Sequence, residues 1–399
     1  MSEIRTPGRV EDGGLSADAR AALKRAALAG VAATADVART LAVDIHGDPE
    51  LSGAEHRSRT RCVEALAGAG FRVEEIDGVP TGFVATSDRP SPGPRIGLFA
   101  EYDALPEVGH GCGHQLIAGA VIGAGLGLAA VADRLPGTVV VFGCPAEETL
   151  SGKRAMIEAG AFTGLEYALS FHAHDETTVM TQSTGNRELH FRFTGTPSHA
   201  SSEPWKGTSA LDGALLTIQN VNALRQFVRD GVRIHGTVHT GTAHNVVPAS
   251  ATCTYGVRSS DLAELDRVVE RVIDCARAGA LASNTTVEVE FGASAEPVLS
   301  DPGVEAVARA NLEALGETVT EWRAMASTDF GDVSRIVPAA LVSVASWPPG
   351  TPFHSYEAAE HGVREQALAA MVQGARALAA TAVDLATGHD VTHAGGEEN

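Results

Sequence analysis

The stretch that decides the fold of this chain is Leu98-Phe-Ala-Glu-Tyr-Asp-Ala-Leu-Pro-Glu-Val-Gly-His-Gly-Cys-Gly-His-Gln-Leu-Ile117. An apolar run ends here in two acidic residues, Glu101 and Asp103, and a glycine-containing loop with Cys112 and His114 follows. The run of small and apolar residues after the loop predicts a buried helix. A strand, a polar loop and a helix in this order indicate an α/β fold, in which sites form at the carboxyl ends of strands.

Two later apolar runs also end in residues that bind metals. The first ends just before Glu147 and Glu148, and the second ends at His172, with His174 two residues further on. Three successive predicted strand ends therefore carry thiol, imidazole or carboxylate groups. Such a mixed set suits zinc and its neighbours, with manganese as the alternative. The sequence predicts a metal site formed by these strand ends.

Composition excludes several classes of function. The chain has 399 residues, a formal net charge of −20 and five cysteines. An anionic protein of this kind is a poor partner for nucleic acid or an anionic membrane, and we expect no apolar run to span a bilayer. Sparse cysteines in odd number argue against a disulfide framework and favour the cytoplasm. Residues 1–15 lack the apolar core of a signal peptide, and we expect them to be a disordered lead-in.

The pattern of the sequence changes near residue 183 and changes back near residue 298. Between these points we expect a strand, a helix, two strands, a helix and a strand, which is the order of a split βαβ unit. We therefore predict an inserted domain over 186–291. Residues 16–185 and 292–399 would form one discontinuous metal-binding domain around it.

The acidic pair after the second run suggests hydrolytic chemistry. Adjacent residues on an extended chain point in opposite directions. One carboxylate of Glu147 and Glu148 can then bind metal while the other faces an activated water as a base. The alternative is a solvated acidic turn. Similarly, Cys112 and His114 could reach one ion, or could be a buried thiol beside a surface histidine.

Other candidates are weaker when taken singly. His199, in the loop Gly195-Thr-Pro-Ser-His-Ala200, could stabilise an oxyanion, or could be an ordinary surface histidine. Asn245 and Arg258 flank a predicted strand, and arginine recognises carboxylates through paired hydrogen bonds, although most arginines are solvated or structural. His354 follows a proline-containing loop after an apolar strand.

Taken in order, these motifs resemble the M20 family of metallopeptidases, in its amidohydrolase branch. That branch includes aminobenzoyl-glutamate hydrolases and unusual dipeptidases. The resemblance runs from about residue 44 to about residue 373. It rests on His46-Gly-Asp-Pro-Glu-Leu-Ser-Gly-Ala-Glu55, Ala100-Glu-Tyr-Asp-Ala-Leu-Pro106, Gly111-Cys-Gly-His114, Pro145-Ala-Glu-Glu148 and Gly195-Thr-Pro-Ser-His-Ala200. Gln115 stands where many members have Asp, and it favours the aminobenzoyl-glutamate and dipeptidase side of the branch, as does Asp329-Phe-Gly-Asp332.

The resemblance implies a fold and a set of roles. The fold is a phosphorylase/hydrolase-like zinc-exopeptidase catalytic domain with an inserted ferredoxin-like lid and dimerisation domain. The implied ligands of two divalent ions, zinc or manganese, are Cys112, His114, Glu148, His172 and His354. Glu147 would be the general base, and Asp103 would orient a ligand. His199 would stabilise the oxyanion, and Asn245 and Arg258 would contact the substrate. His174 remains an alternative to His172.

The resulting hypothesis is a cytoplasmic, homodimeric, metal-dependent amidohydrolase. Its substrate would be small and would bear a carboxylate, such as an N-acyl amino acid, an aminobenzoyl-glutamate-like conjugate or an unusual dipeptide. The first alternative is an aminopeptidase acting on longer peptides. The second is a non-catalytic metal-binding scaffold protein, against which an intact Glu147 argues, because binding alone needs no base.

Overall fold

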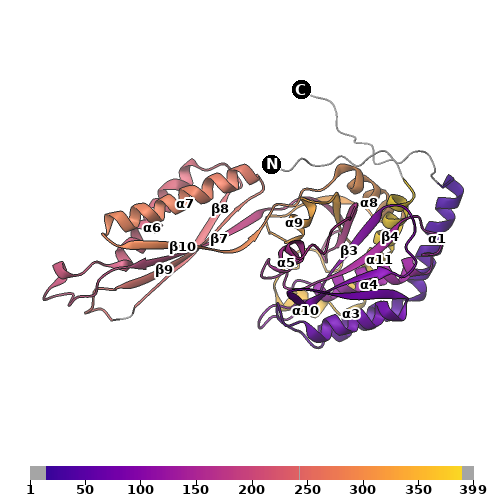
Figure 1. The fold of residues 1–399 in the computed structure, drawn as a ribbon, viewed down its shortest axis with the longest axis horizontal. Coiled ribbons are helices and arrows are strands. Elements are labelled where there is room, and N and C mark those ends of the chain that lie inside the picture. The colour runs from indigo at the N-terminus through magenta and orange to yellow at the C-terminus, as the bar shows by residue number, and fades with distance from the viewer. Residues whose placement is uncertain (1–14, 242, 389–399) are drawn as a thin grey trace, which may run out of the picture. The chain divides into compact units, whose positions relative to one another are not determined.

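The computed structural model describes residues 15–241 and 243–388, which form two compact units (Figure 1). The second unit comprises Ser183–Pro297 together with Met325–Thr328, and the first unit comprises the other described residues. The domain predicted over 186–291 lies within the second unit, whereas the short stretch near residue 326 has no counterpart in the sequence pattern. The expected lead-in over 1–15 lies, except for Leu15, outside the described residues.

The first unit is built on a mixed eight-stranded sheet with the order β1-β2-β4-β3-β5-β12-β6-β11. Its strands are β1 (Phe71–Ile76), β2 (Val79–Ser87), β3 (Arg95–Glu101), β4 (Thr138–Cys144), β5 (Tyr167–Phe171), β6 (Thr178–Gln182), β11 (Thr320–Arg323) and β12 (Ala339–Ser343). The neighbours β4, β3, β5 and β12 are parallel, so their carboxyl ends meet at one edge of the sheet. This edge receives the residues that come after each of these strands.

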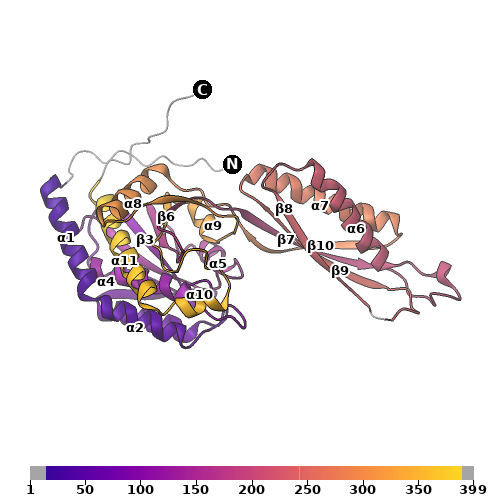
Figure 2. The same cartoon turned by 180° about the vertical axis from the view of Figure 1, so that it is seen from behind.

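Helices cover both faces of this sheet (Figure 2). One face packs against α1 (Ala17–Ala33), α2 (Ala35–His46), α3 (His56–Gly68), α4 (His114–Ala129), α8 (Pro302–Ala314), α10 (Tyr356–His361) and α11 (Glu365–Ala386). The other face packs against α5 (Gly152–Glu158) and α9 (Phe330–Ser334). Leu98 and Val141 point into the first core, whereas Phe99 and Phe142 point into the second. Burial on both faces explains why β3 and β4 are continuously apolar in sequence.

The N-terminal helical segment is broken into two helices. The helices α1 and α2 meet at Thr34 with a bend of 49°. The Thr34 hydroxyl donates to the Gly30 carbonyl oxygen (3.0 Å), a bond that competes with the helical pattern. Gly30 lies so close to α4 that a Cβ there would be 2.7 Å from the Gly127 carbonyl oxygen. The break lets both helices pack on α4.

The expectation that no segment could span a bilayer was too strict. By length and composition α11 is long and apolar enough to do so, as is the bent α1–α2 pair. In α11, however, 78% of the apolar window is buried inside the protein. A core helix of a folded domain meets the same criterion.

The second unit is a four-stranded antiparallel sheet with the order β10-β7-β9-β8. Its strands are β7 (Gly185–Thr194), β8 (Arg233–Thr240), β9 (Ser250–Ser259) and β10 (Thr286–Ala295). Two helices, α6 (Ala210–Leu224) and α7 (Leu262–Ala282), lie side by side on one face of the sheet (Figure 1). Short 3-10 helices occupy Pro204–Lys206 and Arg225–Phe227. The elements follow each other as in a split βαβ unit.

Candidate active site

The candidate site is assembled from loops that leave the parallel strands of the first unit. Asp103 follows β3, and Cys112 lies in the loop that leads to His114, the first residue of α4. The chain turns sharply after β4 because Ala146 has a positive φ of 55°. The buried carboxylate of Glu55 accepts a hydrogen bond from the Ala146 amide (2.8 Å), which holds this turn in place. The turn presents the acidic pair that follows it.

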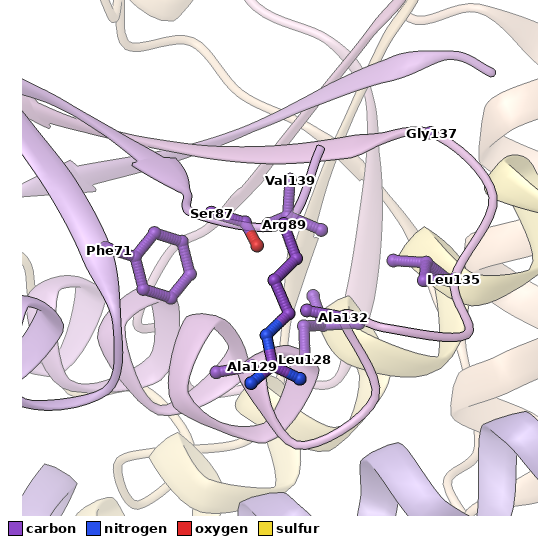
Figure 3. A pocket seen from close by; sticks show the side chains of 9 residues that line it. All are labelled: Phe71, Ser87, Arg89, Leu128, Ala129, Ala132, Leu135, Gly137 and Val139. Atoms are coloured by element: carbon purple, nitrogen blue, oxygen red, sulfur yellow. The ribbon is translucent and has the colours of Figure 1, made fainter. Parts of the chain in front are cut away.

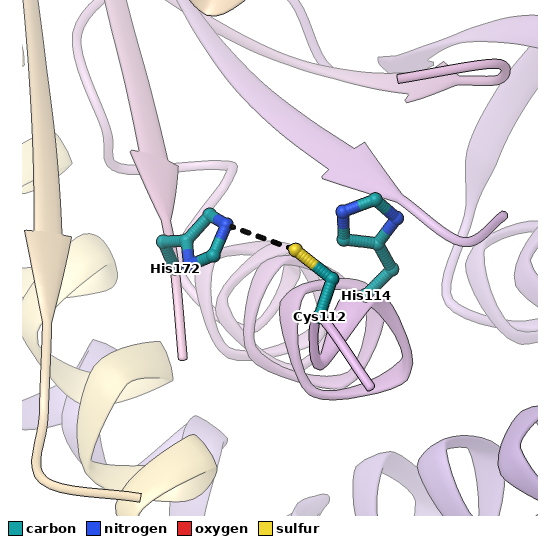
Figure 4. A group of neighbouring side chains, drawn as sticks. All are labelled: Cys112, His114 and His172. Atoms are coloured by element: carbon teal, nitrogen blue, oxygen red, sulfur yellow. Dashed lines mark hydrogen bonds between the residues drawn. The ribbon is translucent and has the colours of Figure 1, made fainter. Parts of the chain in front are cut away.

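The structure brings the five residues expected to bind metal into one cluster. The Cys112 Sγ lies 3.8 Å from the His172 Nε2, and the thiol stands between the imidazoles of His172 and His114 (Figure 4). The Glu148 carboxylate lies 3.8 Å from the His114 Nε2 and 3.6 Å from the His354 Nε2. Two groups of donors share Cys112, and the donor atoms within each group lie within 4.8 Å of one another.

The donor set fits one or two divalent cations. Among the described residues, the buried His114 Nε2 and Glu148 Oε1 have no hydrogen-bond partner. The contacts of 3.6–3.8 Å around His114 are too long for hydrogen bonds. Burial also raises the pKa of the Cys112 thiol, so a bound cation would have to stabilise the thiolate. Converging buried donors without partners are what a metal would satisfy.

Asp103 lies behind the cluster and fixes two of its members. Its Oδ1 lies 3.0 Å from the His114 Nδ1, and its Oδ2 accepts hydrogen bonds from the Ser52 hydroxyl (2.7 Å) and the Glu148 amide (3.0 Å). Although burial opposes ionisation, the charge of His114 and these hydrogen bonds lower the pKa of Asp103 to about 2. A carboxylate at Nδ1 leaves Nε2 of the same ring free as a ligand atom.

Glu147 is buried beside the cluster, with one carboxylate oxygen 3.6 Å from the His114 Nε2. Burial, reinforced by the negative charges of Glu101 and Asp329, raises its pKa well above the ordinary value. A carboxylate with a raised pKa is a stronger proton acceptor. The geometry therefore distinguishes Glu147 from Glu148, which lies between two imidazoles.

A buried lysine that the sequence pattern does not indicate lies near Glu147. The Lys153 ammonium is fully buried and donates to Glu101 Oε1 (2.6 Å) and to Asp329 Oδ1. The second Glu101 oxygen lies 3.8 Å from the His114 Nε2. The sequence does draw attention to Glu101, which ends an apolar run, and to Asp329, which begins the motif Asp329-Phe-Gly-Asp332. Lys153 lies in an ordinary short helix, and no sequence signal marks it.

His174 and His172 occupy different surroundings. His172 is in contact with Cys112, whereas the His174 Nδ1 accepts a hydrogen bond from the Glu176 amide (2.9 Å). The His174 ring packs against Trp322, with ring centroids 4.5 Å apart. Of the two candidates, the distances favour His172 as the ligand.

His199 and Asn245 belong to the second unit, where they lie next to each other. The Ala200 amide donates to the Asn245 carbonyl oxygen (3.0 Å), and His199 forms a bridge with Val246. The exposed His199 ring accepts hydrogen bonds at Nδ1 from the amides of Ser201 (3.3 Å) and Ser202 (3.2 Å). With Nδ1 as acceptor, Nε2 carries the proton and can donate.

Arg258 and Asn245, which were both expected to contact the substrate, do not lie near each other within this chain. Arg258 lies near the carboxyl end of β9, pairs with Asn186 and donates to the Ser327 hydroxyl (2.8 Å). The strand is regular from Ser250 to Ser259, so at about 3.3 Å per residue Ser250 and Arg258 are about 26 Å apart. Asn245 precedes Ser250, beyond the opposite end of the strand.

A small pocket elsewhere in the first unit carries none of these residues (Figure 3). It is lined by Arg89, Gly137 and Val139 among others, at the amino end of β4. The candidate site lies at the carboxyl end of the same strand. The pocket volume of about 10 Å³ accommodates no more than a water molecule.

Comparisons with known proteins agree with one another. The model of peptidase family M20/M25/M40 matches residues 97–384. An Xaa-Arg dipeptidase of Mus musculus is 34% identical, over 82% of this chain and 81% of that protein. One subunit of the p-aminobenzoyl-glutamate hydrolase of Escherichia coli K12 is 28% identical, over 86% and 88%. A Bacillus subtilis structure, described as a dinuclear metal-binding peptidase from the M20 family, superposes with a TM-score of 0.70 at 21% identity, over 88% and 98%.

Proposed function

This chain belongs to peptidase family M20/M25/M40, and from that premise we propose that it hydrolyses the amide bond of a small substrate bearing a carboxylate. Enzymes of this family are metal-dependent hydrolases. The substrate classes that we propose are unusual dipeptides, aminobenzoyl-glutamate-like conjugates and N-acyl amino acids. Two relatives are named for the first two classes, and a third is named N-acetyl-L-cysteine deacetylase, from Bacillus subtilis.

The observation that carries the proposal is the convergence of five donors with a separate buried carboxylate at one sheet edge. We assign Cys112, His114, Glu148, His172 and His354 as ligands of two divalent ions, zinc or manganese. When bound, the ions would supply a Lewis acid that polarises the amide carbonyl and acidifies water. A thiolate ligand favours zinc, but mixed sites also take manganese.

The protein's own groups would complete the reaction. Glu147 takes a proton from the attacking water and passes it to the nitrogen of the leaving amine. Asp103 holds the His114 ring by its Nδ1 and the Glu148 amide by its second oxygen. We further propose that the His199 Nε2–H stabilises the developing oxyanion and that Arg258 recognises the substrate carboxylate.

We propose that the second unit acts as a lid and dimerisation domain, with His199 and Asn245 serving the site of a partner subunit. Their position at the end of the sheet opposite Arg258 supports this division of labour. The chain enters and leaves the second unit at the Arg258 end, where β7 begins and β10 ends. A cytoplasmic location is proposed because all five cysteines are free thiols.

Metal content and activity, measured on the same preparations, test the proposal. We expect about two ions per chain in the wild type and fewer in Cys112→Ala. We also expect chelator-sensitive hydrolysis of at least one member of a panel of β-alanyl dipeptides, aminobenzoyl-glutamate and N-acyl amino acids. Faster cleavage of longer peptides would favour the aminopeptidase alternative. Metal-loaded protein that is inactive on every amide would contradict the proposal.

A further inference from the structure

An aromatic wall, defined as Trp322, Phe353 and His174, lies beside the candidate metal centre. The rings of Trp322 and Phe353 are nearly parallel, at 5°, with centroids 6.1 Å apart. His174 lies 4.5 Å from Trp322 and 5.6 Å from Phe353. These residues come from three separate segments of the chain, and all three are only partly buried. Each of the three residues therefore keeps part of its surface accessible to solvent.

The wall is continuous with the metal centre. The His172 ring centroid is 5.5 Å from that of Trp322 and 5.7 Å from that of Phe353. Phe353 also directly precedes His354. Behind it, the fully buried Trp347 packs edge-on against Phe353 at 5.2 Å. A substrate bound at the centre would therefore have a rigid aromatic surface alongside it.

The charges around the wall are predominantly negative. Asp175 and Glu176 directly follow His174, and the Asp175 Oδ1 lies 3.1 Å from the His174 Nδ1. Arg323 follows Trp322 in β11, and the pairing with β6 is irregular between these two residues. Its guanidinium pairs with Glu321 at 3.3 Å. An aromatic face with acidic neighbours attracts cations, and tryptophan does so most strongly.

We propose that Trp322, Phe353 and His174 form a subsite for the planar cationic side chain of the substrate, with the guanidinium of arginine as the best-fitting group. The proposal rests on the proposed function, because it places the subsite beside the hydrolytic centre. Stacking of the guanidinium on an aromatic face and attraction by the acidic rim would both act on the positive charge. A neutral group of the same shape would gain only the stacking.

Citrulline supplies this neutral group, because its ureido side chain has nearly the shape of the arginine guanidinium. We would measure kcat/KM for β-alanyl-arginine and β-alanyl-citrulline with metal-loaded wild type, Trp322→Ala and Trp322→Phe. We expect the wild type to prefer arginine and Trp322→Ala to lose about tenfold of that preference. Trp322→Phe should retain most of it. Phe227→Ala, which removes an exposed ring in the second unit, is the matched control and should behave as wild type.

The outcomes separate the subsite from the proposed function. Equal losses on both dipeptides in Trp322→Ala would mean that the ring is only structural and would overturn the subsite. A wild type that prefers citrulline or neutral aromatic side chains would overturn the cationic assignment. If no dipeptide is cleaved, the binding of free arginine and of free citrulline, measured by calorimetry, still tests the subsite. Arginine binding that weakens in Trp322→Ala would support the subsite although the proposed function had failed, and no arginine preference in binding would overturn it.

Discussion

Glu147 and Glu148 are adjacent in sequence, yet their carboxylates have different surroundings. Glu148 lies between the imidazoles of His114 and His354, and its amide donates to Asp103. Glu147 is more deeply buried, and its pKa is raised by burial and by the negative charges of nearby acids. The extended chain that we expected at this pair is a turn in the structure, which follows the positive φ of Ala146. The buried environment favours a base at one position and a ligand at the other.

Replacing each of these acids by its amide should separate the two roles. Glu147→Gln should lower kcat by about 10²–10⁴-fold with unchanged metal content, because the proton acceptor is lost while the ligands remain. Glu148→Gln should lower metal content as well as activity. Elemental analysis and steady-state kinetics on both variants would check this. If Glu147→Gln lost as much metal as Glu148→Gln, the assignment of the base would be wrong.

At the scale of elements, the start of α4 depends on one glycine. Gly113 precedes the helix with a φ of 85°, and it lies between Cys112 and His114. A Cβ at this position would lie 2.7 Å from the Cβ of Ala173 and 3.0 Å from the ring of Trp347. The close approach to the segment after β5 brings the thiol and imidazole of this loop next to His172. Both the backbone conformation and the lack of space require glycine here.

Gly109 offers a matched control in the same loop. It also has a positive φ, of 71°, but a Cβ there would meet nothing within 4 Å. Gly109→Ala should cost about 1–2 kcal/mol of unfolding free energy from the left-handed backbone alone and should keep metal. Gly113→Ala should cost about 1–3 kcal/mol more, because of overpacking, and should lose metal. Denaturant unfolding and elemental analysis would check this, and equal effects of the two variants would contradict it.

At the scale of the whole molecule, the second unit presents functional candidates at both ends of one sheet. Arg258 lies at the end where the chain enters and leaves, and His199 and Asn245 lie at the other end. A rigid antiparallel sheet cannot bring these ends to one substrate. This arrangement is the basis of our proposal that different subunits supply the two ends.

Mixing two inactive variants tests this assembly. Glu147→Gln keeps His199, and His199→Ala keeps Glu147. In a mixed homodimer one of the two sites would hold both intact residues if His199 acts across subunits. Random mixing should then restore about a quarter of wild-type activity, because half of the dimers are mixed and each has one complete site. Activity after denaturing and refolding the mixture would be compared with that of each variant treated alone. No gain on mixing would mean that His199 acts within its own chain or has no role.

Local pattern was enough to predict much of the fold and the group of candidate ligands. The apolar runs of β3, β4 and β5 were readable together with the polar residues after them, because parallel strands deliver the residues at their carboxyl ends to one edge. The break at Thr34 was not readable, because it depends on how closely Gly30 approaches α4. The distance between Asn245 and Arg258 could not be predicted from the sequence either, because it depends on the length and regularity of β9.

The sequence by itself determined much of the secondary structure, the chemical types at the strand ends and the resemblance to a family. Only the tertiary structure decided which groups are buried, paired or left without partners. Lys153 meets Glu101 across 52 residues and Asp329 across 176 residues, and Trp322 meets Phe353 across the helix α9 and the strand β12. Such contacts leave no periodic signal, because they arise when packing removes water from side chains that are distant in the chain.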